Sequence, residues 1–216
     1  MQRLVSSRHR RPGAEHRQSC LKTHNSKRNG HQADNPSINV FGDGHHLAAA
    51  SPRRRPPAPM TPAINAAKKA KIRYTIHQYS HDPAADSYGM EAADKLGVPP
   101  AQVFKTLVVS LDDALAVAVV PVASMLSMKL FARATGAKKA NMAAAAEVER
   151  ATGYVLGGVS PLGQKKRLRT IIDASAESLA TLFVSAGRRG LSIELLPKDL
   201  QDLTGATFAA ICQQER

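Results

Sequence analysis

The 216-residue chain contains no tryptophan, and its aromatic residues together make up 4% of the sequence. Alanine, valine and leucine must therefore fill most of any hydrophobic core. Cysteine is scarce too, because Cys20 and Cys212 are the only two and lie far apart. Such spacing supports neither a disulfide framework nor a cysteine zinc site. It favours a reduced intracellular protein, and we expect a cytoplasmic location.

No apolar run reaches the roughly 18 residues that a membrane-spanning helix needs. The first residues also lack the apolar segment of a secretory signal, so we expect no membrane partner. The chain has neither the G-x-G-x-x-G pattern of dinucleotide-binding folds nor a Walker phosphate loop. Function classes that depend on those loops are therefore excluded.

Acidic residues are few relative to basic ones, and the formal net charge is +13. A charge of this sign and size indicates an anionic partner, with nucleic acid first. The charge is uneven along the chain. Residues 1–59 hold 11 basic and 3 acidic residues, a net charge of +8, whereas residues 60–216 hold 19 and 14, a net charge of +5.

Residues 1–59 are rich in Arg, His, Ser, Asn and Pro, and their apolar residues have no helical or strand period. This composition predicts a disordered basic extension, which could be an RNA-binding arm or a targeting segment. A second interpretation, which we favour, is that translation starts at Met60. A helix start follows directly, with Thr61 as the cap and Pro62 at the first helical position. The predicted folded domain is 60–216.

From residue 60 onward, periodicity and turn residues predict an α/β protein of the α+β type, in which helices pack on a mixed β-sheet. Residues 104–111 and 114–121 should form a hairpin. Its second strand is almost entirely apolar and should be buried on both faces. The predicted helices are 63–71, 87–96, 124–135, 143–152 and 197–203, and the predicted strands are 72–78, 104–111, 114–121, 170–173, 182–185 and 191–196.

The segment from Gly157 to Arg167 is the first candidate for a functional site. Its paired glycines can bring backbone N–H groups close to one oxygen, either of an anion or of a developing oxyanion. The basic run that closes it could hold a polyanion. A plain surface loop would have the same composition. Lys105, a lone charge in an apolar strand, is either a cation at a pocket mouth or an edge lysine whose amine reaches solvent.

A metal site has little support in the sequence. His77 and His81 are four residues apart but lie across a predicted strand end, and no H-E-x-x-H pattern accompanies them. No Ser-His-Asp or Cys-His set is evident near the Gly157 loop. We expect no metal and no cofactor.

Four segments, spread in order between Met60 and the C-terminus, have a recognisable combined pattern: 104–107 (FKTL), 152–154 (TGY), 157–167 (GGVSPLGQKKR) and 184–191 (VSAGRRGL). Together they resemble the YbaK/EbsC family of freestanding aminoacyl-tRNA deacylases. Residues 1–59 have no counterpart. The resemblance implies a curled, barrel-like mixed sheet flanked by helices, homologous to the editing domain of prolyl-tRNA synthetase. It implies trans-editing deacylation of Cys-tRNA(Pro), with prolyl-tRNA synthetase as a partner.

The resemblance also implies roles for particular residues. The catalytic set is Lys105 with the loop residues Gly157, Gly158, Val159, Ser160 and Pro161. The substrate pocket is Tyr79, Tyr88, Thr106, Ser185 and Gly187. From their charge, rather than from the resemblance, we expect the basic segments to contact the tRNA acceptor end, with a solvated surface patch as the alternative for each: Lys138, Lys139, Lys165, Lys166, Arg167, Arg188 and Arg189. The chain departs from some relatives at two positions. Ser192 stands where they have Asp, so it is given no catalytic role, and Ala186 stands where they have Gly.

In the implied mechanism the substrate thiol attacks its own ester, and the cysteine leaves as a thiolactone. This mechanism suits a site in which no protein nucleophile is evident. A water molecule held by Lys105 or a backbone carbonyl is the alternative. Two other functions stay open. One is a deacylase for another substrate, such as Ala-tRNA(Pro), and the other is a non-catalytic module that binds tRNA or a synthetase.

Overall fold

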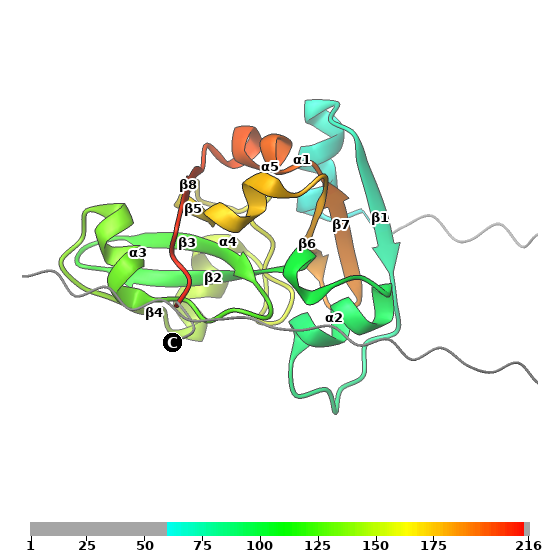
Figure 1. Ribbon diagram of the computed structural model, residues 1–216, viewed down its shortest axis with the longest axis horizontal. Coiled ribbons are helices and arrows are strands. Elements are labelled where there is room, and N and C mark those ends of the chain that lie inside the picture. Colours follow the sequence, from blue (N-terminus) through cyan, green and yellow to red (C-terminus); the bar gives the residue numbers. More distant parts are fainter. Residues whose placement is uncertain (1–59, 214–216) are drawn as a thin grey trace, which may run out of the picture. The chain divides into compact units, whose positions relative to one another are not determined.

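The computed structural model describes residues 60–213 (Figure 1). The predicted extension, 1–59, lies outside the described residues, so the prediction about it stays untested. Within the described part, none of the helices combines the length and the apolar character needed to cross a membrane.

The described residues form a mixed α/β fold with two sheets. One is an antiparallel sheet in the order β1 (Tyr74–Gln78), β7 (Leu191–Leu195), β6 (Leu182–Arg188). The other has the order β4 (Ala140–Met142), β2 (Phe104–Leu111), β3 (Leu115–Pro121), β5 (Arg169–Asp173), β8 (Thr207–Ala209). In it β5 runs parallel to both β3 and β8.

The mixed sheet is therefore confirmed, and the described strands are divided between two sheets. A lone bridge between Val103 and Phe183 joins the two sheets, so β2 and β6 do not form a continuous ladder. Over the described residues the strands do not close, and the barrel-like form is not confirmed.

The hairpin of β2 and β3 forms as the sequence predicts, and β3 lies inside its sheet between β2 and β5. Its residues from Ala116 to Val120 have no exposed surface. Val117 and Val119 pack into one core cluster, whereas Ala116, Ala118 and Val120 pack into another. The strand is buried on both faces, which explains its unbroken apolar sequence.

Between residues 60 and 213 the chain forms five helices, α1 (Pro62–Ala70), α2 (Tyr88–Leu96), α3 (Met128–Thr135), α4 (Ala145–Thr152) and α5 (Pro197–Thr204), with short 3₁₀ turns at η1 (Pro100–Gln102) and η2 (Ala174–Ser178). The predicted cap at Thr61 is confirmed, since its hydroxyl accepts from the N–H of Ile64 at 3.2 Å. The hydroxyl of Ser87 caps α2 through the N–H of Met90.

The C-terminal segment differs most from expectation. Helix α3 begins at Met128 rather than at 124, because Leu126 pairs with Cys212 and the Ser127 N–H donates to the Ile211 carbonyl. The short strands β4 and β8 also escaped prediction. Three residues are too few to display an alternating pattern.

Asp173 anchors this C-terminal segment to β5. Its carboxylate accepts from the N–H groups of Ile211 at 3.0 Å and Cys212 at 3.1 Å, and from the backbone N–H and hydroxyl of Ser175. Burial alone would raise the pKa of Asp173, but these hydrogen bonds outweigh burial and lower it. A lowered carboxyl pKa stabilises the fold at neutral pH, and that contribution is lost as the pH falls.

We expect Asp173→Asn to lower the free energy of unfolding by about 1–3 kcal/mol at neutral pH, because an amide offers fewer acceptors and turns a donor toward N–H groups. Urea unfolding followed by circular dichroism measures this change. The difference from wild type should narrow as the pH falls below 3.8, the ordinary value for this carboxyl. Asp202→Asn, at an exposed ion pair with Lys198, is the matched control and should change stability little. An equal loss in both variants would contradict the anchoring role.

Candidate active site

A cavity of about 350 Å³ opens where the first part of β2, the start of α2, the β6–β7 hairpin and the loop after α4 meet. Its lining includes eight of the residues that the sequence marks as candidates: Tyr79, Tyr88, Lys105, Thr106, Gly157, Val159, Ser185 and Arg188. Residues from separate parts of the chain thus converge on one concave surface. A cavity of this size suits a small ligand or one end of a larger one.

The glycine loop enters the cavity through a tight turn at 155–158. The N–H of Gly158 donates to the Val155 carbonyl at 3.0 Å, and Gly157 has a φ of +81° at the third position of the turn. This is the geometry of a type II turn, which favours glycine there. The Gly158 N–H is used in closing the turn, so the backbone N–H groups of the other loop residues in the cavity wall, Leu156, Gly157 and Val159, remain as candidate donors.

Tyr154 supports the loop from beneath. Its buried side chain donates from the hydroxyl to the Leu162 carbonyl at 2.8 Å, and burial raises the pKa of Tyr154 to about 12. The loop is therefore tied across its base from Tyr154 to Leu162. This hydrogen bond joins the two ends of the segment that contains the turn.

Lys105 is the only lysine in the cavity wall. Its amine lies 3.4 Å from the Val122 carbonyl, which also belongs to the wall. Burial lowers the pKa of Lys105, because removing the ammonium from water disfavours its charged form. The nearby Cys212 thiol stays neutral, because burial and the Asp173 carboxylate raise its pKa to about 12. Lys105 therefore provides a partly desolvated amine for a ligand.

Several hydroxyl groups also line the cavity. Ser185 and Ser192 lie opposite each other in the β6–β7 ladder, and both line the cavity together with Tyr79. Burial raises the pKa of Tyr79, and the Glu91 charge adds to this, so its phenol stays neutral. Thr106 differs, since its Oγ1 is buried and has no hydrogen-bond partner among the described residues. A buried unpaired hydroxyl beside a cavity is suited to a polar group of a ligand.

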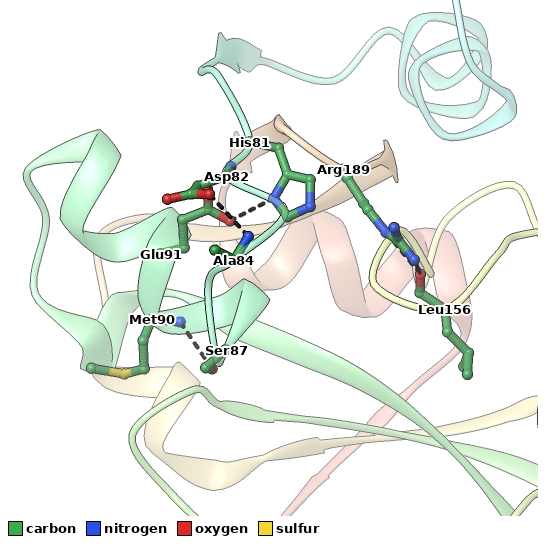
Figure 2. Close-up of polar contacts among 8 residues, drawn as sticks. All are labelled: His81, Asp82, Ala84, Ser87, Met90, Glu91, Leu156 and Arg189. Carbon is green, nitrogen blue, oxygen red and sulfur yellow. Dashed lines mark hydrogen bonds and ion pairs between the residues drawn. The ribbon is translucent and has the colours of Figure 1, made fainter.

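Next to Tyr88 in the cavity wall, hydrogen bonds hold the loop at 81–82 against helix α2 (Figure 2). Glu91 accepts from His81 Nδ1 at 2.7 Å and from the Asp82 N–H at 2.6 Å. Burial would raise the pKa of Glu91, but these hydrogen bonds outweigh burial and lower it. The carboxylate therefore fixes the loop to α2, where the Tyr88 ring lies 5.4 Å from the His81 ring.

Four of the predicted catalytic and substrate-pocket residues do not belong to the cavity wall. Ser160 and Pro161 are buried, and the Ser160 hydroxyl accepts from the Leu162 N–H. Gly158 lies behind the wall, where an added Cβ would be 3.2 Å from the Arg188 Cα. Gly187, at a φ of +96°, leaves room for the Tyr154 ring and donates to the Ser185 hydroxyl at 3.2 Å. Their proposed roles are thus in shaping the loop and the hairpin rather than in contacting a ligand.

The predicted tRNA-binding residues are divided among different surfaces. Arg188 lines the main cavity and Arg189 lies at its mouth. Lys166 and Arg167 line a second cavity beside α5, and the Lys165 side chain lies against Gly153. Lys138 and Lys139 line a third, between α3 and β4, with their N–H groups held by Asp112. Only the two arginines are next to the main cavity, and the RNA contacts of the others stay predictions.

Sequence reasoning missed part of the wall. Asp86, Ser87 and Gly89 enter it from the start of α2, while Val122, Leu156 and Ser192 enter it from neighbouring strands and loops. The hairpin register could have revealed Ser192, since a strand partner of Ser185 must share its surroundings. Nothing in the local sequence distinguishes the others from ordinary helix-start and core residues.

The two candidate metal-binding histidines have separate partners. His77 Nε2 lies 2.8 Å from a Glu194 oxygen, and His81 is paired with Glu91. Across residues 60–213 there is no group of three side chains arranged to hold a metal ion.

Known proteins are similar to this chain in sequence. Residues 82–203 match the model of the aminoacyl-tRNA editing domain. A protein of Enterococcus faecalis named as a candidate Cys-tRNA(Pro)/Cys-tRNA(Cys) deacylase, EbsC, is 36% identical over 157 residues, which cover 72% of this chain and 94% of the relative. A proline–tRNA ligase of Shouchella clausii is 30% identical over 126 residues, covering 58% of this chain but 21% of the ligase.

The fold has solved counterparts as well. The crystal structure of a candidate trans-editing enzyme for prolyl-tRNA synthetase matches with a TM-score of 0.61 and 23% identity, over 72% of this chain and all of that one. The matching domain model and the EbsC relative define the class of protein as an aminoacyl-tRNA deacylase, whose role is editing of misacylated tRNA. More particularly, the chain belongs to the aminoacyl-tRNA editing domain family, in which the sequence motifs had placed it.

Proposed function

We propose that this protein removes cysteine from Cys-tRNA(Pro) in trans, after the ester has been formed in error. The observation that supports this best is the composition of the cavity. It combines a desolvated amine, an unpaired hydroxyl and a glycine turn, yet its lining residues include no histidine and no cysteine. A site of this kind can position and stabilise a reacting ester but has no activated protein nucleophile.

The missing nucleophile is supplied by the substrate. The cysteinyl sulfur attacks the carbonyl carbon of its own ester, forming a carbon–sulfur bond, and the carbon–oxygen bond to the terminal ribose breaks. The thiol proton is transferred to the departing ribose oxygen, so the products are a cysteine thiolactone and a tRNA with a free hydroxyl. The enzyme contributes by holding sulfur and carbonyl in reacting geometry.

The residues of the cavity have distinct roles in this proposal. The N–H groups of Gly157 and Val159 face the carbonyl oxygen as it gains negative charge. Lys105 orients the ester or its ribose through its ammonium group. The Thr106 hydroxyl pairs with a polar group of the aminoacyl part, which satisfies its own hydrogen-bonding need.

We further propose that the protein takes its choice of tRNA from prolyl-tRNA synthetase. Lysine and arginine contacts to phosphates give affinity and salt dependence but carry little sequence information. Misacylation arises because cysteine and proline are close in size, and a binding pocket rejects such a near-isostere by only about 1–3 kcal/mol. Acting beside the synthetase, in the cytoplasm, would direct a weakly selective deacylase to the right tRNA.

A panel of esters on tRNA(Pro) tests the function. Cysteine, serine and alanine esters are compared with the wild-type protein, with and without a chelator. We expect the cysteine ester to react at least about 100-fold faster than the serine ester, because only the thiol is an effective internal nucleophile. Thiolactone should be the first product, and the chelator should have no effect.

Other outcomes of this panel point to the alternatives. Equal rates for cysteine and alanine esters would assign the reaction to a water molecule and favour an Ala-tRNA(Pro) deacylase. Salt-sensitive RNA binding without turnover of any ester would favour a non-catalytic binding module.

A further inference from the structure

Arg189 contacts two residues of the cavity wall, Tyr88 and Leu156. Its Cζ lies 4.9 Å from the centre of the Tyr88 ring, within the range of a cation–π contact. Its Nε and Nη2 both donate to the Leu156 carbonyl, at 3.2 and 2.9 Å, and Figure 2 shows the guanidinium directed at that oxygen. Two N–H groups on one carbonyl fix the orientation of the guanidinium plane, so Arg189 is more than a mobile surface charge.

Glycine at position 157 makes this arrangement possible. A Cβ there would lie 2.8 Å from Tyr88 Cε2 and 2.9 Å from Arg189 Nε. The ring, the guanidinium and the turn at 155–158 therefore pack as one unit. That unit adjoins the backbone N–H groups that are proposed to donate to the ester carbonyl. No ion pair to Arg189 is found in the part of the chain that the structure describes.

The surroundings of this pair are unusually apolar for a protein surface. Tyr88 is 42% exposed, Leu156 45% and Val155 56%. Large apolar side chains beside exposed arginines are typical of surfaces that bind single-stranded nucleic acid, where bases stack and phosphates lie near positive charge. The exposed Arg188, the last residue of β6 and the neighbour of Arg189, lines the cavity wall.

We propose that Tyr88 and Arg189 form a stacking platform for a nucleobase of the single-stranded 3′ end of the aminoacylated RNA. The base lies on the guanidinium plane, which Tyr88 and the Leu156 carbonyl keep in place, while the esterified ribose enters the cavity. This inference rests on the proposed function, since it assumes that the ester is the cavity's ligand. It differs from a phosphate contact because the plane of Arg189, and not its charge alone, carries the binding.

Arg189→Lys separates the two roles, because it keeps the charge and removes the plane. The probe is an acceptor-stem hairpin RNA that carries no amino acid and ends in single-stranded CCA, with 2-aminopurine in place of the last adenine. Stacking quenches this fluorophore, and the protein has no tryptophan to interfere. We expect wild type to quench it and Arg189→Lys to lose the quenching, with affinity falling roughly 5- to 150-fold. The salt dependence of binding should stay unchanged in this variant.

Two further variants keep the test decisive. Tyr88→Leu removes the ring beneath the guanidinium and should give the same loss of quenching. Arg150→Lys makes the same substitution at an exposed arginine of α4, 75% exposed and 4.0 Å from Glu147, and should match wild type. Urea midpoints of all three variants establish that they are folded.

The inference is overturned if folded Arg189→Lys quenches and binds as wild type does, since charge alone would then suffice. Failure of the proposed function gives a different result, because wild type would then hydrolyse none of the esters in the panel. A third result is that wild type hydrolyses the cysteine ester and Arg189→Lys keeps the wild-type KM and quenching. This result would contradict the stacking platform and leave the proposed function intact.

Discussion

Lys105→Ala is expected to lower the rate of Cys-tRNA(Pro) deacylation by about 10²–10³-fold, the usual effect of removing one group that stabilises a developing charge. Lys105 is the lysine of the cavity wall, and its amine makes only a 3.4 Å contact with the Val122 carbonyl. Stability should therefore change little, because a desolvated ammonium with one long hydrogen bond contributes little to the fold. Single-turnover deacylation gives the rate, and urea unfolding gives the stability.

Lys198→Ala is the matched control, since it removes a lysine whose exposed ion pair with Asp202 lies on α5. It should leave the rate unchanged. Full activity in Lys105→Ala would remove Lys105 from the mechanism and leave the glycine turn as the remaining candidate.

The pH dependence of the same reaction identifies the active form of Lys105. Burial lowers its pKa below the ordinary value of 10.5. If the ammonium acts, the enzymatic rate falls as the pH rises through that lowered pKa, after subtraction of the hydroxide-driven background. Lys105→Arg should shift this fall to higher pH, because a guanidinium keeps its proton. A rate that instead rises with deprotonation of Lys105 would make the neutral amine a base, in contradiction to an orienting role.

Local chemistry explains what the sequence could predict. Thr61 and Ser87 cap helices because a hydroxyl placed before a helical run satisfies its free N–H groups. The strand from Leu115 to Pro121 could be assigned to the sheet interior because all of its side chains are apolar. Lys105 and Gly157 stood out for the opposite reason, since a lone charge in a strand and paired glycines both break the local pattern.

The contacts that escaped prediction all join residues distant in the chain. Asp173 resembles any helix-capping carboxylate until Ile211 and Cys212 are brought to it across 38 and 39 positions. The contact of Arg189 with Leu156 spans 33 positions, and a basic dipeptide alone cannot distinguish a fixed guanidinium from a solvated one. For the same reason, the sequence could not show that Lys138 and Lys139 lie away from the main cavity. Charge composition carries no information about which surface a side chain occupies.

Gly157→Ala is expected to abolish most of the deacylation while leaving the protein folded. Its alanine would have to adopt a φ of +81°, which costs an L-residue roughly 1–2 kcal/mol. Its Cβ would also meet Tyr88 and Arg189 at 2.8 and 2.9 Å, closer than carbon atoms normally approach. The turn, the ring and the guanidinium must then shift, and a displacement of about 1 Å at a reacting centre can cost about 100-fold in rate.

Gly97→Ala separates backbone strain from the collision. Gly97 ends α2 at a φ of +67°, and an added Cβ would meet no atom within 4 Å. Both variants should therefore lose a similar amount of stability from strain, as measured by urea unfolding. Only Gly157→Ala should lose deacylation and the quenching of a terminal 2-aminopurine. Equal activity in the two variants would mean that the 157 turn is merely a surface loop, and that the carbonyl of the ester is stabilised elsewhere in the cavity.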